Sequence, residues 1–509
     1  MAVVHDFATR SVDTYVQEQD GASGKFGRMF PTDPNQPSDE ALYELGRAML
    51  DRKPSSQQGN NGNIPVGYTY LGQFIDHDIS FDPTSLQETF IDLQALKNFR
   101  TPGLDLDSLY GAGPVSQPYL YQRNPTRPTS DLFLLGKTST KLGKLDPTLR
   151  TGLPFDLPRG PEGLALISDP RNDEHLIIAQ LHLAFLRFHN QVVKKPPYHI
   201  PPALRFETAR KLVIWHYQWI VLKHFLPLVL NKEQLQSVLR DGRKCYRPQG
   251  EPFIPVEFAA AANRFGHSMV RESYDYNRVL TFRAGGKELA TLKGLFNFTG
   301  FSGDGQGTPI PSDRIIDWRR FFKLDEHVEV SFSRKIDPFL SPPLHTLPNV
   351  PAKIPALKSL AILDLLRGKK RCLPSGQRVA EILGLQALTP DEIRQGLDGE
   401  VARKHGLDIK TPLWYYVMKE AEVREQGQRL GPVGGRIVAE VFVGLLECDS
   451  ESFLACDPPW KPMLPSKQQD DFTMEDLLKF TGDLNPIDDP YNRNVYKQST
   501  PMASPFLSR

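Results

Sequence analysis

The run from Asn172 to Val193 constrains the fold of this chain more than any other segment. Leucine, isoleucine, alanine and phenylalanine recur in it so closely that a helix over these residues is apolar around much of its circumference. A helix without a continuous polar face has to be enclosed by other elements. The chain has 509 residues, which is enough to enclose it in one large unit or in two to three domains. We therefore expect a buried central helix.

Helical patterns dominate the rest of the chain. The segments 101–170 and 306–357 are rich in proline and glycine and predict long loops, and few segments alternate with the period of a strand. The fold class predicted is therefore mainly α, with long loops and few short strands. Further helices are expected over Ser38–Asp51, 66–80, Pro202–Phe225, Val256–Val270, Leu357–Leu366, Gly376–Leu383, Pro390–Leu397, Leu413–Arg424, Gly434–Leu446 and Met474–Phe480.

The overall charge excludes a polyanion as the main partner. The 61 lysines and arginines nearly cancel the 60 aspartates and glutamates, and no basic block stands out. We therefore expect no nucleic acid and a small molecule as the partner.

The first thirty residues, the lengths of the apolar runs and the cysteines limit the class of protein further. The first thirty residues lack the apolar core of a signal peptide, and no window approaches about eighteen consecutive apolar residues. The sequence thus predicts no membrane span and a cytoplasmic protein, or one exported by a route without a visible signal peptide. Four scattered cysteines without a Cys-x-x-Cys pair exclude a zinc knuckle and a covalent c-type haem attachment. Cys448 and Cys456 could pair, or all four could be reduced.

The stretch GQFIDHD, residues 72–78, places a histidine between two carboxylates. Gln73 and His77 are four residues apart and share one face of the expected helix, and Asp76 and Asp78 flank His77. Alone, this pattern also fits a histidine held by surface carboxylates. It equally suits a histidine that handles protons beside a bound cation and a cofactor.

An oxygen-rich segment follows about twenty residues later. The run TPGLDLDS, residues 101–108, alternates oxygen-bearing and apolar residues. Together with Asp78 it could form a shell of hard oxygen ligands around an ion of the size of calcium. The ion site and His77 would then share one short segment.

The sequence DPRNDE, residues 169–174, precedes the central helix and is an ordinary helix start. Taken with His77, it has a chemical interpretation. A histidine that can move a proton and an arginine that keeps its charge are the pair needed to cleave a peroxide O–O bond. Arg171 is the arginine of that pair.

A second histidine, His267, follows a glycine in the sequence NRFGHSM, residues 263–269. A small residue beside it lets a flat cofactor come close, which suits axial ligation of haem iron. A core histidine bonded to the backbone is the alternative. A ligating histidine also needs an acceptor for its other ring nitrogen, and Gln377 in RGKKRCLPSGQ, residues 367–377, could serve.

Taken together and in this order, the five segments resemble those of the animal-type haem peroxidases of the peroxidase-cyclooxygenase superfamily, and within it the shorter bacterial members. The resemblance covers roughly residues 66–450. It implies a helical haem peroxidase fold with an N-terminal arm at 1–65, a catalytic domain at 66–450 and a C-terminal extension at 451–509 packed on that domain.

The resemblance also implies a role for each matching residue. His77 would be the distal acid-base with Gln73 as its partner, Arg171 the distal arginine, and His267 the iron ligand, oriented by the segment with Gln377. Haem b would contact Arg264 through a propionate and could be ester-linked to Asp76 and Glu174. Calcium would be bound by Asp78, Thr101, the carbonyl of Gly103, Asp105 and Asp107.

Three positions depart from the pattern of relatives. Gln377 stands where the family usually has asparagine. His175 stands where the halide-oxidising members with a third haem link have methionine, which excludes a sulfonium link. Arg264, three residues before His267, stands where the lipid-oxygenating branch has a radical-forming tyrosine, which favours a peroxidase over a cyclooxygenase.

The function expected from the resemblance is reduction of hydrogen peroxide and oxidation of a small electron donor through a ferryl intermediate. A haem-dependent fatty-acid dioxygenase is the first alternative, and a non-catalytic haem-binding adhesion or sensor module is the second. The presence of both His77 and Arg171 favours the enzyme, because a binding module needs neither. His175, His182 and His189 recur every seven residues, about 10 Å apart along a helix, and so predict packing or hydrogen bonding rather than one metal site.

Overall fold

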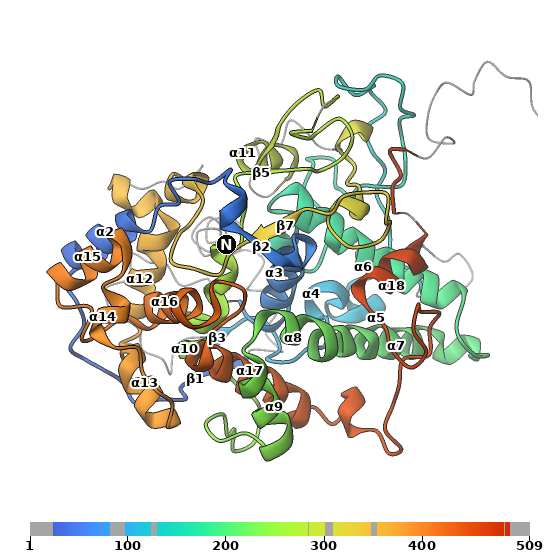
Figure 1. The fold of residues 1–509 in the computed structure, drawn as a ribbon. Helices are drawn as coiled ribbons and strands as arrows, with labels where there is room; N and C mark the ends of the chain where they lie inside the picture. The colour runs from blue at the N-terminus through green and yellow to red at the C-terminus, as the bar shows by residue number, and fades with distance from the viewer. Residues whose placement is uncertain are drawn as a thin grey trace, which may run out of the picture.

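The computed structural model describes residues 24–81, 97–123, 130–283, 285–300, 309–347, 354–482 and 484–488. These residues form mainly helices with a few short strands, so the predicted fold class is confirmed (Figure 1). Residues 1–23 of the expected N-terminal arm and 489–509 of the expected C-terminal extension lie outside the described residues. The three-part division of the chain stays a prediction.

Helix α6, Leu176–Lys194, is the buried central helix that the apolar run predicted. Most of its side chains are buried, and it packs against α3 (Gly67–Ile79), α7 (Arg205–Trp219) and α18 (Met474–Thr481). It begins later than expected. His175 is extended at the N-cap with φ −150°, and its Nδ1 accepts from the backbone N–H of Ile178, so residues 170–173 form a separate 3₁₀ turn.

The other expected helices occur in the predicted order, and the helices at 107–110, 113–116, 232–241, 292–295 and 396–404 were not predicted. Helix α7 continues through a π-helical segment, Ile220–Phe225, into α8. The remaining α-helices are α2 (Asp39–Ala48), α4 (Asp107–Tyr110), α5 (Gly113–Ser116), α8 (Leu226–Val229), α9 (Lys232–Asp241), α10 (Val256–Ala259), α11 (Leu292–Leu295), α12 (Leu360–Lys370), α13 (Gly376–Leu383), α14 (Pro390–Ile393), α15 (Gly396–Lys404), α16 (Leu413–Glu425) and α17 (Pro432–Cys448).

One expected helix is wrong in detail. The range Val256–Val270 is not continuous: α10 ends at Ala259, and Ala262–His267 form the 3₁₀ helix η6. Asparagine and glycine, both poor helix formers, occupy positions 263 and 266 of this segment. His267 therefore lies at the end of a 3₁₀ turn rather than on an α-helix.

The strands are short and only tie segments together. β1 (Gly24–Gly27) pairs antiparallel with β3 (Lys97–Asn98) and parallel with β4 (Ile254–Pro255). β2 (Asn60–Pro65) pairs antiparallel with β7 (Phe332–Arg334), and β5 (Ser273–Tyr274) pairs antiparallel with β6 (Ala290–Thr291). All four cysteines are unpaired, so the alternative of a Cys448–Cys456 bond is not realised.

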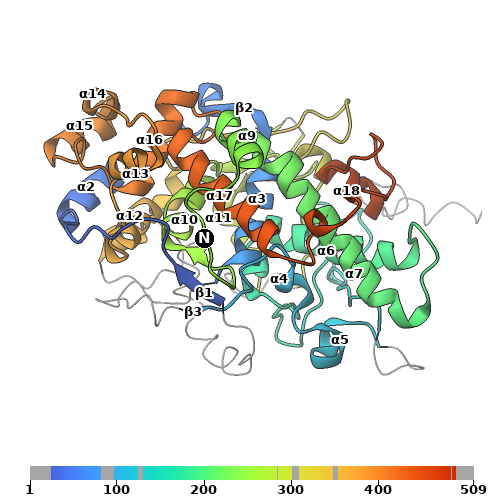
Figure 2. The same ribbon diagram turned by 90° about the horizontal axis from the view of Figure 1, so that it is seen from below.

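The helices gather into two groups with α3 between them. Both views place α2 and α12–α15 at one end of the molecule and α6, α7 and α18 at the other (Figures 1 and 2). In the described part of the C-terminal extension, Trp460 packs against Trp215 and His216 of α7, with ring centroids 5.3 and 5.0 Å apart. Among the helices described, none combines the length and apolar character needed to cross a membrane.

Candidate active site

Helix α3 carries the GQFIDHD stretch and is buried along almost its whole length. It can enter the core only because its first residue is Gly67. A Cβ at that position would lie 2.4 Å from the ring of Phe322 and 2.8 Å from the carbonyl of Phe321. Gln73 and His77 therefore sit on a helix whose start is fixed by a close backbone approach.

His77 is buried and is held through one ring nitrogen. Its Nδ1 lies 2.9 Å from Oδ1 of Asn172, and only 2% of the residue is exposed. Burial, together with the nearby cation of Arg171, holds the pKa of His77 well below its usual range. Because the amide oxygen accepts from Nδ1–H, Nε2 is left as the basic nitrogen of a neutral ring. The sequence did not predict a role for Asn172, although Asn172 directly follows Arg171.

Arg171 lies beside His77, as expected, but its guanidinium contacts the backbone rather than the ring. Nη2 donates to the carbonyl of His77 and Nη1 to that of Ser80, both at 2.8 Å. Nε and Nη2 also donate to the carboxylate of Asp169, at 3.0 and 2.7 Å. A direct contact of Arg171 with peroxide stays a prediction. In this structure Arg171 fixes the C-terminal end of α3.

Gln73, one turn before His77 on α3, forms a hydrogen-bonded network with His175 and Glu174. Nε2 of His175 donates to Oε1 of Gln73 at 3.0 Å, because Nδ1 of His175 already accepts from Ile178. Nε2 of Gln73 in turn donates to Glu174 at 3.3 Å. Burial raises the pKa of Glu174 to about 7. His175 thus has a hydrogen-bonding role, one of the two roles expected for it.

His267 is paired with a buried carboxylate. Its Nδ1 lies 2.6 Å from Oδ2 of Asp364 on α12, and both side chains are almost fully buried. Burial alone would raise the pKa of Asp364, but His267, Arg264 and Arg367 together hold it below its usual value. A carboxylate that accepts from Nδ1–H fixes the tautomer and leaves Nε2 available to a metal.

Gln377 does not orient His267, and that prediction is wrong. Its amide donates to the hydroxyl of Thr411 at 2.7 Å and accepts from the backbone N–H of Thr411 at 3.0 Å. It thus joins α13 to the start of α16. Asp364, thirteen residues earlier, takes the place expected for Gln377, and no sequence motif marks it.

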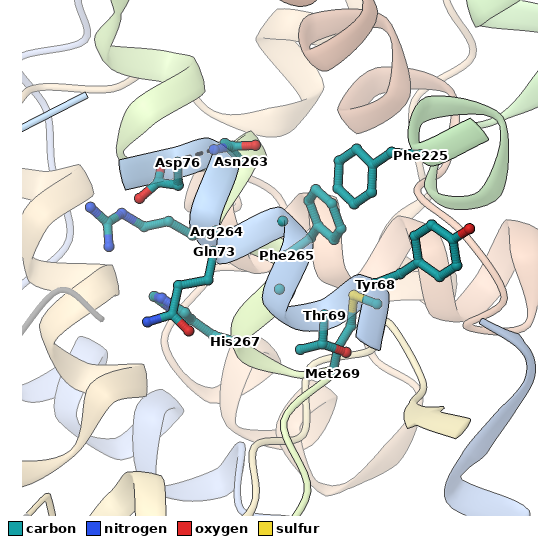
Figure 3. A pocket seen from close by; sticks show the side chains of 12 residues that line it. Tyr68, Thr69, Gln73, Asp76, Phe225, Asn263, Arg264, Phe265, His267 and Met269 are labelled. Atoms are coloured by element: carbon teal, nitrogen blue, oxygen red, sulfur yellow. Dashed lines mark hydrogen bonds between the residues drawn. The ribbon is translucent and has the colours of Figure 1, made fainter. Parts of the chain in front are cut away.

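A small cavity of about 20 Å³ lies between α3 and the segment that ends at His267. Figure 3 shows Gln73, Asp76, Arg264 and His267 on one side of α3 and Tyr68 and Phe225 on the other. Asp76 accepts from the amide of Asn263 at 2.9 Å. Arg264 donates from Nε to the carbonyl of Ala259 at 2.8 Å, which fixes its side chain at the cavity wall.

The donors around this cavity fit haem. His267 presents a ring nitrogen whose partner nitrogen is already bonded, and it follows Gly266, where an added Cβ would meet no atom within 4 Å. That open space beside the ligand histidine is what a flat macrocycle requires. Among the residues that line the cavity, His267 could bind the iron, and Arg264 and Asp76 could contact the rest of the haem. Glu174 is bonded to Gln73, which also lines the cavity.

Three carboxylates meet next to His77. Ligand atoms of Asp78, Asp105 and Asp107 all lie within 4.8 Å of one another, the only such group among the described residues. Oδ1 of Asp107 is buried without a hydrogen-bond donor. Burial, followed by mutual repulsion, raises the pKa of Asp78 well above its usual range and that of Asp105 to about 7. An unsatisfied acceptor among crowded carboxylates fits a hard cation such as calcium.

The other two predicted calcium ligands lie in the same loop. The backbone N–H of Thr101 donates to Oδ2 of Asp107 at 2.9 Å, and its hydroxyl lies 3.3 Å from the same atom. Gly103 donates its N–H to the carbonyl of Thr101 at 2.8 Å. The loop thus folds back on the carboxylates, and ligation by Thr101 and by the Gly103 carbonyl stays a prediction.

Comparison with known sequences supports the resemblance. The sequence model of a family described as animal haem peroxidase matches residues 94–299, which include the Thr101–Asp107 loop, Arg171 and His267. Over 137 residues the chain is 32% identical to chorion peroxidase of Aedes aegypti, covering 25% of this chain and 17% of that protein. Over 115 residues it is 34% identical to a peroxidase-like protein of Margaritifera margaritifera, covering 21% and 14%. The matched part thus spans less than a fifth of these relatives.

Solved structures share the fold. Peroxidase A from Dictyostelium discoideum superposes with a TM-score of 0.58 at 16% identity, covering 85% of this chain and 89% of that one. A fatty acid alpha-dioxygenase from Oryza sativa superposes with a TM-score of 0.56 at 13% identity, covering 95% and 91%. Residues 94–299 thus match the animal haem peroxidase family, and the chain shares its fold with solved structures of a peroxidase and of a fatty acid alpha-dioxygenase.

Proposed function

We propose that this protein is a haem peroxidase that reduces hydrogen peroxide and oxidises a small electron donor. One observation carries the proposal: His267, held by Asp364, lines the same cavity as Gln73, and His77 lies one turn after Gln73 on α3. A ligand histidine and a neutral base are the two protein groups that peroxide cleavage needs.

Haem bound in the cavity would supply the iron that binds peroxide and the oxidising equivalents that the donor removes. The chain supplies the proton chemistry. Nε2 of His77 would take the proton from one peroxide oxygen and return it to the other, which would leave as water. One N–H of Gln73 is bonded to Glu174, and the other is available to orient peroxide.

Arg171 has a different role in this proposal from the one the sequence predicted. Its positive charge lies behind His77 and is bonded to the carbonyls of His77 and Ser80. It therefore holds the base in place and favours its neutral form, which is the form able to accept a proton. It acts on the reaction through His77.

The proposal extends to the haem edge and to a cation. Asp76 and Glu174 are the carboxyl groups available for ester links to haem, and Asp78, Asp105 and Asp107 are the proposed ligands of calcium. Because Asp78 directly follows His77, the cation would brace the end of α3 that carries the base.

A haem-dependent fatty-acid dioxygenase is the second candidate, because the fold is shared with a protein of that description. Arg264 weighs against it. The arginine occupies the position where the lipid-oxygenating branch has its tyrosine, and it is bonded to the carbonyl of Ala259. Oxygen uptake on addition of palmitic acid, without peroxide, would favour the dioxygenase. Peroxide-dependent oxidation of a phenolic donor favours the peroxidase.

We expect His267→Ala to abolish or strongly reduce haem binding, because it removes the nitrogen proposed for the iron. Full-length protein made with haem supplied should show a Soret band that changes on addition of hydrogen peroxide. The variant should lose the band or shift it. His199→Ala, which changes an exposed histidine, is the control and should keep the spectrum. The same haem content and spectrum in His267→Ala would contradict the assignment.

Asp364→Asn should weaken the donation from His267 Nδ1–H, because a neutral amide is a poorer acceptor than a carboxylate. We expect a lower iron–histidine stretching frequency in resonance Raman spectra of the ferrous protein and a higher reduction potential. Gln377→Ala should change neither, since Gln377 bonds to Thr411. If Gln377→Ala changed the iron–histidine stretching frequency and Asp364→Asn did not, Gln377 would be the residue that orients His267.

Asp105→Ala should lower the calcium content measured by elemental analysis, because one of three convergent carboxylates is lost. Chelation should lower the midpoint of thermal unfolding of the unmodified protein and have little effect on the variant. Asp391→Ala removes a carboxylate that is 89% exposed and serves as the control. If the purified protein contained no calcium and the chelator did not change the midpoint, the three carboxylates would not be a calcium site.

His77→Ala should slow the reaction with hydrogen peroxide by at least ~100-fold while haem content is kept, because the base is lost. Arg171→Ala should also slow it, and in addition lower the free energy of unfolding by about 3 kcal/mol, because a buried pair with Asp169 is broken. The double variant should be little slower than the slower single one. Stopped-flow mixing and urea unfolding measure the two effects. His77→Ala reacting at the unmodified rate would end the mechanism.

A further inference from the structure

The side chain of Asn172 lies between two buried histidines and meets the same nitrogen on each. Its Oδ1 is 2.9 Å from Nδ1 of His77, and its Nδ2 is 3.0 Å from Nδ1 of His182. His182 and Asn172 are fully buried and His77 is 2% exposed. The backbone N–H of Asn172 donates to the carbonyl of Asp169 at 3.0 Å, which fixes where the amide sits.

An amide has one end that accepts and one end that donates. The histidine that faces the oxygen must carry a proton on Nδ1, and the histidine that faces the NH₂ group must have a bare Nδ1. For neutral rings, the remaining proton of the second histidine is then on Nε2. His77 and His182 are therefore tied to opposite tautomers, and turning the amide over would exchange the two.

We propose that Asn172 and His182 act as a positioning pair that sets which ring nitrogen of His77 carries the proton. In the structure the amide oxygen faces His77, so Nε2 of His77 is bare and can accept a proton. If the amide were turned over, Nε2 of His77 would carry the proton and the ring could no longer act as a base. The catalytic consequence rests on the proposed function, whereas the tautomer pattern does not.

His182 is the member that holds the amide in its orientation. Its Nδ1 is the acceptor for the NH₂ group of Asn172, and its Nε2 is buried without a hydrogen-bond partner among the described residues. A buried ring nitrogen without a hydrogen-bond partner is uncommon and requires an explanation. In the part of the chain that the structure describes, the contact with Asn172 is the one hydrogen bond of this ring, and Asn172 is also the partner of His77.

The tautomers are measurable without haem. In long-range ¹H–¹⁵N spectra of the full-length protein, labelled at histidine and made without added haem, a ring nitrogen that carries a proton is distinguished from a bare one. His77→Ala and His182→Leu assign the signals by their loss. We expect protonated Nδ1 and bare Nε2 for His77, and the reverse for His182. The same tautomer in both rings, or a proton on Nε2 of neutral His77, would overturn the inference.

Two substitutions of Asn172 sharpen the test. Asn172→Asp offers only acceptors, so His77 should keep its proton on Nδ1 while His182 moves its proton from Nε2 to Nδ1. Asn172→Leu offers neither group and should release both rings from opposite tautomers. Opposite tautomers that persist in Asn172→Leu would show that another contact sets them and would overturn the pair. Circular dichroism checks that each variant is folded.

The haem-loaded protein gives the kinetic arm of the experiment. Asn172→Leu should slow the reaction with hydrogen peroxide by about tenfold or more, a part of the loss expected for removing the base itself, and Asn172→Asp should retain more of the rate than Asn172→Leu. An Asn172→Leu protein at the unmodified rate would overturn the positioning role. If the wild-type protein shows opposite tautomers but does not react with peroxide, the proposed function fails and the tautomer assignment stands.

Discussion

A buried chain of alternating charges joins the carboxylate cluster to the end of helix α3, and the site depends on it. Arg100 lies between two aspartates, with Nη1 3.7 Å from Asp107 and Nε 2.8 Å from Asp169. Asp169 also receives Arg171, which donates to the carbonyl of His77. In a buried network, removing one charge leaves its neighbour uncompensated. The cluster, the turn at residues 170–173 and the helix that carries His77 are therefore one electrostatic unit.

Elements specified by local periodicity were predictable from the sequence, and those specified by distant partners were not. The apolar run that becomes α6 carries its own signal in the spacing of its side chains, and so does the placement of Gln73 and His77 on one face of α3. The α-helix expected over Val256–Val270 ends at Ala259, and residues 262–267 beside the cavity form a 3₁₀ helix instead. Apolar spacing alone does not distinguish the two kinds of helix at that length.

In the candidate site, the types of functional residue could be predicted from the sequence, but their hydrogen-bond partners could not. The sequence identified histidines, carboxylates and an arginine suited to the chemistry, and the structure brings His77, Arg171 and the aspartate cluster together. It could not identify Asp364 as the partner of His267, because the two are 97 residues apart and meet only through the packing of α12 on the η6 segment. Nor could it show that Arg171 would direct its donors to backbone carbonyls, since that depends on where α3 ends.

The two histidines assigned to the reaction differ in the group that accepts from Nδ1, and the difference matches their proposed tasks. His267 donates to a carboxylate, which draws the proton away and makes the opposite nitrogen a stronger ligand for iron. His77 donates to the amide of Asn172, which holds the ring but adds no negative charge. A base that must release its proton again within one turnover is better served by the neutral acceptor. A carboxylate in place of Asn172 would stabilise the charged ring and slow that return, so the chemistry itself explains why the carboxylate and the amide stand where they do.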